Sequence, residues 1–153
     1  MYDRILVPTD GSKVAEIAVD HAVDIAEKYD ASLYALYVVD TDAVDLALGT
    51  EQVDRIRAGK FGEMDELKSR AEEATDAVVE KASKRGIKAT AEFRTGRPHT
   101  VISDFAENHD IDLIVMGSKG RSGIRRALLG SVTERTLRST HRPVLVVDYQ
   151  EEE

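Results

Sequence analysis

Glycines and cations are concentrated in residues 113–132, which read LIVMGSKGRSGIRRALLGSV. The first four residues are apolar and predict a buried strand. The polar part that follows ends at Ser131, which we expect to cap a helix. Its glycines and cations are Gly117, Gly120, Gly123, Gly130, Lys119, Arg121, Arg125 and Arg126. Bare backbone N–H groups and a helix N-terminus both favour an anion. The stretch therefore predicts a site for a phosphate chain.

Charge is unevenly distributed along the chain. The formal net charge is −8, yet residues 117–142 hold seven Lys and Arg against Glu134 alone, a net charge of +6 that leaves −14 for the rest. An acidic protein lacks the basic footprint of a nucleic-acid binder, and the sequence shows no stripe of aromatic residues for base stacking. A cationic segment in an acidic chain instead favours a small anionic ligand and excludes a nucleic-acid partner.

Length and composition predict one domain over residues 1–153, because 42% of the residues are hydrophobic and 33% are charged. With no Cys, disulfides, thiolate metal sites and Cys nucleophiles are excluded.

The apolar runs are too short to span a membrane and we find no signal peptide, so we expect a cytoplasmic protein without a membrane partner. Residues 41–62 predict a long irregular excursion, and residues 149–153 a solvated acidic tail.

Short apolar runs alternate with helical patterns along the chain. We expect strands at residues 4–7, 32–39, 89–94, 113–116 and 144–147. We expect helices at residues 12–29, with Ser12 as N-cap, at 64–85, at 98–109, and from Ser131 to a stop at Pro143. This alternation predicts an α/β fold with a parallel sheet covered on both faces. Ligands bind such sheets at the carboxyl ends of the strands. The turn 8–11 and the loop 117–130 should therefore be neighbours in space.

The glycine spacing resembles that of a known family. Gly117, Gly120 and Gly130 stand in the pattern Gly-x-x-Gly-(nine residues)-Gly-Ser, which is neither a Walker A loop nor a Rossmann fingerprint. The opening RILVPTDGS and the later runs IRRALLGSVTERTL and RPVLVV extend the similarity. Together they resemble the ATP-binding branch of the universal stress protein family, over nearly the whole chain except residues 40–61.

The resemblance implies a fold, a ligand and an assembly. The fold would be a three-layer α/β sandwich, Rossmann-like and of the adenine-nucleotide alpha-hydrolase type, with a five-stranded parallel sheet in the order 3-2-1-4-5. The ligand would be ATP, accompanied by Mg²⁺ or Mn²⁺ because phosphate oxygens are hard ligands. A homodimer would form through strand 144–147, an edge strand whose open side is a liability when unpaired.

The resemblance also implies roles for individual residues. Asp10 would hold the ribose, its neighbours Pro8 and Thr9 would flank the adenosine, and the backbone of Val38 would read the adenine edge. Met116 would lie beside Gly117 at the end of its strand. The phosphates would lie against Gly117, Gly120, Gly130, Ser131 and Val132, with further contacts from Arg121 and Ser122.

Simpler interpretations remain open at several of these positions. Asp10 is also a good helix-capping residue, Met116 is a typical core residue, and Gly117 and Gly120 are also compatible with simple turns. We find no catalytic base placed for attack on a γ-phosphate. The functional hypothesis is therefore a nucleotide-dependent signalling or stress-response module with an unknown protein partner. A slow ATPase, or a nucleotidyl- or phosphoryl-transfer enzyme, is the alternative.

Overall fold

The computed structural model describes residues 1–41, 62–119 and 129–149, with side chains described from residue 65 onward in the second of these ranges. Three predicted site residues, Gly120, Arg121 and Ser122, lie outside the described part of the chain. The expected excursion at residues 41–62 and the tail at 149–153 lie outside it except at their described ends.

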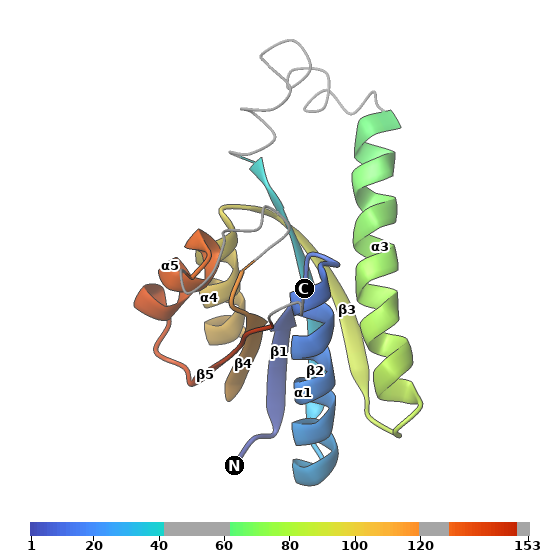
Figure 1. The fold of residues 1–153 in the computed structure, drawn as a ribbon, viewed down its shortest axis with the longest axis vertical. Coiled ribbons are helices and arrows are strands. Elements are labelled where there is room, and N and C mark those ends of the chain that lie inside the picture. The colour runs from blue at the N-terminus through green and yellow to red at the C-terminus, as the bar shows by residue number, and fades with distance from the viewer. Residues whose placement is uncertain (42–61, 120–128, 150–153) are drawn as a thin grey trace.

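Five parallel strands form a single sheet (Figure 1). They are β1 (Arg4–Pro8), β2 (Ser32–Asp40), β3 (Ala89–Gly96), β4 (Leu113–Gly117) and β5 (Val144–Val147). Their order is β3-β2-β1-β4-β5, so β1 pairs with β2 on one side and with β4 on the other. The predicted α/β fold and strand order are confirmed. Strand order reverses between β1 and β4, which places a ligand-binding crevice at their carboxyl ends.

The helices cover both faces of the sheet, giving three layers. They are α1 (Lys13–Tyr29), α3 (Gly62–Ser83), α4 (Pro98–Asn108) and α5 (Ser131–Ser139). Figure 1 shows α1 and α3 on one face and α4 and α5 on the other. Two predicted helix ends were wrong. The helix α3 ends at Ser83, ahead of a turn in which Gly86 has a φ of +72°, and α5 ends at Ser139, four residues before Pro143.

The core is divided between the two faces of the sheet. Because strand side chains alternate, Ile5 and Val7 pack toward α1 while Leu6 packs toward α4, and all three have no exposed surface. The inner face of α1 is built from small residues, and the fully buried Ala18 and Ala22 lie against the sheet. Burial on both faces holds the ends of the strands in fixed relative positions.

Candidate functional site

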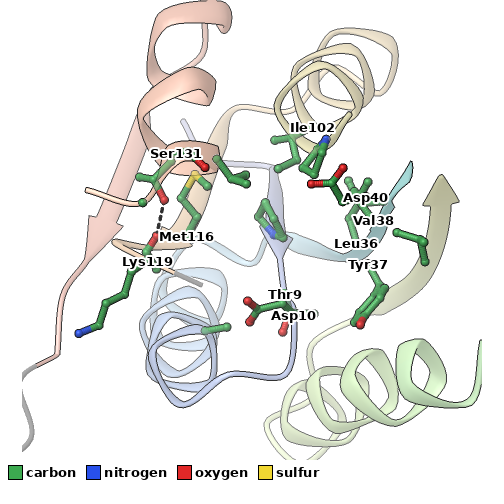
Figure 2. Close-up of a pocket in the computed structure, with 18 of the residues that line it drawn as sticks. Thr9, Asp10, Leu36, Tyr37, Val38, Asp40, Ile102, Met116, Lys119 and Ser131 are labelled. Atoms are coloured by element: carbon green, nitrogen blue, oxygen red, sulfur yellow. Dashed lines mark hydrogen bonds between the residues drawn. The ribbon is translucent and has the colours of Figure 1, made fainter. Parts of the chain in front are cut away.

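A pocket of about 460 Å³ opens at the carboxyl ends of the central strands. Figure 2 shows its wall: Thr9 and Asp10 follow β1, Val38 lies on β2, and Met116 lies on β4 opposite them. The structure brings together nine of the twelve predicted site residues around this pocket: Pro8, Thr9, Asp10, Val38, Met116, Gly117, Gly130, Ser131 and Val132. The turn after β1 and the segment after β4 are thus neighbours, although more than a hundred residues separate them in the chain. Their contact with a nucleotide stays a prediction.

The turn that carries Asp10 is held by its own short side chains. An Oδ1 oxygen of Asp10 accepts the Ser12 N–H at 2.9 Å, and Thr9 Oγ1 accepts the Gly11 N–H at 3.2 Å. Ser12 then caps α1 by accepting the Ala15 N–H at 3.2 Å, as predicted. Asp10 therefore supports the turn that enters α1 and lines the pocket as well, so its structural role and the predicted binding role are compatible.

Gly117 lies where β4 passes closest to the start of α1. A Cβ atom added there would be 2.6 Å from Val14 Cγ1 and 3.4 Å from the Ala15 backbone nitrogen. A larger residue would separate the strand end from the helix, so glycine is required here by close approach. The same narrow approach leaves the backbone of Gly117 exposed to the pocket on its other side.

Hydrogen bonds join the end of β4 to the start of α5. The Gly130 N–H donates to the Ser118 carbonyl at 2.7 Å, and Thr133 Oγ1 donates to the Gly117 carbonyl at 2.8 Å. The N-cap of α5 is Gly130, which has no side chain to accept from the first helical N–H groups. The prediction that Ser131 caps this helix was therefore wrong: Ser131 is its first residue. The uncapped N–H groups leave the helix end suited to an anion.

The pocket wall also contains residues that sequence reasoning missed. Leu36 and Ile102 belong to the apolar cluster beneath α4 and extend the apolar wall next to Val38. Leu36 was detectable, because it lies two residues before Val38 on the same face of β2. The other additions are Ala15, Tyr37, Val39, Asp40, Leu67, Pro98, Lys119 and Thr133. Met116 is only 4% exposed and packs in the core as well as lining the pocket.

Charges near the β4 end of the pocket come from Lys119 and Asp148. A hydrogen bond from the Ser118 hydroxyl holds the pKa of the Asp148 carboxyl below its ordinary value of 3.8, with help from the Tyr149 backbone and the charge of Lys119.

Among residues 1–41, 62–119 and 129–149 there is no group of three His, Cys, Asp or Glu side chains placed to hold a metal ion. None of the helices described here combines the length and apolar character of a bilayer-spanning segment.

Comparison with known proteins places the chain in a family. A family model described as the universal stress protein family matches residues 1–148. The chain belongs to the universal stress protein family. Universal stress protein MJ0531 of Methanocaldococcus jannaschii is 42% identical over 148 residues, covering 96% of this chain and 82% of that protein.

Solved structures of the family share the whole fold. MJ0577 of Methanocaldococcus jannaschii superposes with a TM-score of 0.81 at 30% identity, covering 99% of both chains. The universal stress protein from Archaeoglobus fulgidus in complex with dAMP has a TM-score of 0.67 at 22% identity, covering 95% of this chain and 98% of that chain. Some structural neighbours therefore bind nucleotides.

Proposed function

We propose that this universal stress protein binds ATP and acts in the cytoplasm as a nucleotide-dependent signalling or stress-response module. The observation that carries the proposal is the convergence of β1, β2, β4 and the start of α5 on one pocket. The fold accommodates an adenine nucleotide in the Archaeoglobus fulgidus protein. ATP would order the backbone around the pocket and so change the surface that a partner protein meets.

The apolar part of the pocket suits the adenosine. Val38, Met116 and Ile102 would offer apolar surface to an adenine ring, and the backbone of Val38 would read the edge of the base. The Asp10 carboxylate, at the end of β1, would accept hydrogen bonds from the ribose hydroxyls. A carboxylate accepts such bonds more strongly than a neutral group does.

The phosphates would lie on the opposite side of the pocket. The fit is supported by the uncapped start of α5 at Gly130 and by the close approach of Gly117 to α1, which keeps side chains away from the backbone there. Ser131 and Val132 would donate N–H groups from the first turn of α5. Gly120, Arg121 and Ser122 are proposed to complete this side.

A divalent cation, Mg²⁺ or Mn²⁺, would accompany the triphosphate. It would supply positive charge to the phosphate oxygens and draw most of its ligands from those oxygens and from water, as Mg²⁺ commonly does. Among the described residues, the pocket wall includes the carboxylates of Asp10 and Asp40. The chain's own contribution is to orient the nucleotide.

We also propose a homodimer through β5. This strand is at one edge of the sheet. The carbonyls of Pro143 and Val147 accept from β4, so alternation along the strand directs the backbone groups of Val144 and Val146 toward the open edge. A second copy of β5 would satisfy those groups.

The test of ATP binding is calorimetry with Mg-ATP, together with native mass spectrometry of the freshly purified protein. We expect saturable binding of one nucleotide per chain. Asp10→Asn keeps an oxygen for the Ser12 N–H but removes the charge, and should weaken Mg-ATP binding about tenfold. The matched control is Asp30→Asn at the opposite end of α1, where a positive φ of 53° tolerates Asn. No bound nucleotide and no heat with Mg-ATP would contradict the proposal.

Hydrolysis assays distinguish the module from the alternative enzyme. The purified protein should release phosphate from Mg-ATP slowly, at less than about one turnover per minute, because binding and positioning alone leave the attacking water unactivated. Turnover at many per minute without a partner would replace the module by an ATPase.

A further inference from the structure

Ser118, the residue that follows β4, forms three hydrogen bonds that join it to two distant parts of the chain. It is only 5% exposed. Its N–H donates to the Val147 carbonyl at 2.8 Å, its carbonyl accepts the Gly130 N–H at 2.7 Å, and its hydroxyl donates to Asp148 Oδ1 at 2.6 Å. The first and third bonds reach the end of β5, and the second reaches the start of α5. Ser118 is therefore the point at which the proposed phosphate side of the pocket is joined to the C-terminal strand.

We propose that Asp148 is a positioning residue for the phosphate side of the pocket: through Ser118 it holds the end of β4 in the orientation that binds a triphosphate. The proposal rests on the ATP-binding function proposed above and goes beyond it, because Asp148 is outside the pocket wall and belongs to the segment that follows β5. Asp148 is thus not a ligand-contacting residue, and its effect on ATP passes through Ser118.

The register of the sheet explains why Asp148 reaches Ser118. Gly117 pairs with Val147 across the β4–β5 ladder, so the next residues on the two parallel strands, Ser118 and Asp148, lie opposite each other. A hydroxyl donating to a carboxylate is a charge-assisted hydrogen bond, and its 2.6 Å length is typical of the strong class. The lowered pKa of Asp148, caused first by this bond, agrees with a carboxylate that stays ionised at neutral pH.

The Ser118–Asp148 hydrogen bond would affect phosphate binding through the backbone carbonyl groups beside it. Carbonyl oxygens repel phosphate oxygens. The Gly117 carbonyl accepts from Thr133 of α5 at 2.8 Å, and the Ser118 carbonyl accepts from the N-cap residue Gly130 at 2.7 Å. These hydrogen bonds direct both carbonyl oxygens toward the start of α5. Loss of the Ser118–Asp148 bond would remove one of the three hydrogen bonds that hold Ser118, and would loosen the connection between the end of β4 and the start of α5.

Lys119 adds a positive charge near the same carboxylate. It lines the pocket, and its charge contributes to the lowered pKa of Asp148. Figure 2 shows the Lys119 side chain extending away from Thr9 and Asp10, out of the adenosine side of the pocket. Lys119 would therefore contribute positive potential near the phosphates without entering the place of the ribose.

The test compares Mg-ATP with adenosine, which lacks phosphates, by calorimetry on the full chain. Asp148→Ala should weaken Mg-ATP binding about tenfold while changing adenosine binding by less than about twofold. Asp148→Asn keeps an oxygen that accepts from Ser118 and should lose only about threefold toward Mg-ATP. Ser118→Ala should match Asp148→Ala, and the double variant should be no weaker than either single one, because the two residues act through one bond.

Several outcomes would overturn the proposal. An unchanged ratio of ATP to adenosine affinity in Asp148→Ala, whether both affinities stay the same or both fall, would show that Asp148 has only a structural role. Additive losses in the double variant would show that Asp148 does not act through Ser118. If the unmodified chain binds neither Mg-ATP nor adenosine, the proposed function fails first, and that failure is visible before any variant is made. Asp148→Asn, which removes no atom from the hydrogen bond, covers the case in which Asp148→Ala does not fold.

Discussion

At the scale of single residues, the shape of the pocket depends on a glycine at a close backbone approach and on short polar side chains in a turn. Gly117 allows β4 to end against the first turn of α1, and Ser12 and Asp10 use their own side chains to shape the turn opposite. The turn formed by Asp10 and Ser12 does not depend on distant packing, and it could be predicted from residue type. Gly117 is different, because its neighbour Val14 is distant in sequence. The need for glycine there is apparent only when β4 and α1 are packed together.

Substitution of Gly117 by Ala tests this close approach. The added Cβ would meet Val14 Cγ1 at 2.6 Å and the Val14 carbonyl carbon at 3.3 Å. We expect a loss of about 1–3 kcal/mol in the free energy of unfolding, as is usual for overpacking, measured by urea denaturation. Val14→Ala in the same chain should restore part of the loss by removing the nearest atom. A Gly117→Ala variant as stable as the original chain would contradict this close approach of β4 to α1.

At the scale of elements, α1 and α3 are connected by ion pairs at the surface as well as by the core. Arg85, two residues after α3, donates to both Glu27 carboxylate oxygens and to Asp24, all from α1. These hydrogen bonds raise the pKa of the Arg85 guanidinium and lower that of Glu27. The bidentate geometry orients the end of α3, although solvent-exposed ion pairs contribute little to stability.

Arg85→Ala should therefore lower the melting temperature by only about 2 °C at low salt. The difference from the original chain should shrink in 1 M NaCl, because salt screens exposed charges. Arg70→Ala, which removes a single i,i+4 pair with Glu66, is the matched control and should have a smaller effect. A loss that is large and independent of salt would mean that Arg85 acts through packing of its aliphatic part.

The β5 edge is tested by a proline. Val146→Pro removes an N–H that alternation directs to the open edge, so β4–β5 bonds should survive while pairing with a second copy is lost. Light scattering after size-exclusion chromatography should show a dimer for the original chain and a monomer for this variant. Val146→Thr keeps the N–H and the β-branched shape, and should remain dimeric. A dimer that persists in Val146→Pro would place the interface elsewhere.

At the scale of the whole molecule, acid stability follows from carboxylates that are more acidic in the folded chain. The pKa of Glu27 lies below its ordinary value of 4.5 because Arg85 donates to it, and that of Asp148 lies below 3.8 because Ser118 donates to it. The unfolded chain takes up these protons at higher pH than the folded chain does. Both groups therefore stabilise the fold at neutral pH, and this contribution is lost as the pH falls through their folded-state pKa values.

The melting temperature should accordingly be flat near neutral pH and fall on acidification below about pH 4.5, the ordinary pKa of a glutamate. Glu27→Gln removes one of the two titrating groups, so its acid decline should be shallower than that of the original chain. Thermal scans between neutral pH and pH 3 measure both curves. Parallel declines for the two proteins would exclude Glu27 as a source of the acid sensitivity.

The alternation of strands and helices and the turn after β1 could be predicted from the sequence, because local propensity and periodicity depend on neighbouring residues. The glycine spacing that led to the phosphate-site prediction is likewise visible in the sequence. The boundary of α5 differs by one residue: Gly130, not Ser131, occupies the N-cap position, because the chain turns one residue earlier than the capping preference indicates.

The contacts between distant residues around the proposed phosphate side of the pocket follow from the packing of the strands. Ser118 and Asp148 are thirty residues apart in the chain, and their hydrogen bond exists because parallel pairing of β4 with β5 sets them side by side. Nothing in the types of the two residues predicts that pairing, since serine and aspartate are equally suited to solvent. Register across the sheet is a property of the packed molecule, and it brings Ser118, at the end of β4, next to Asp148, at the end of β5.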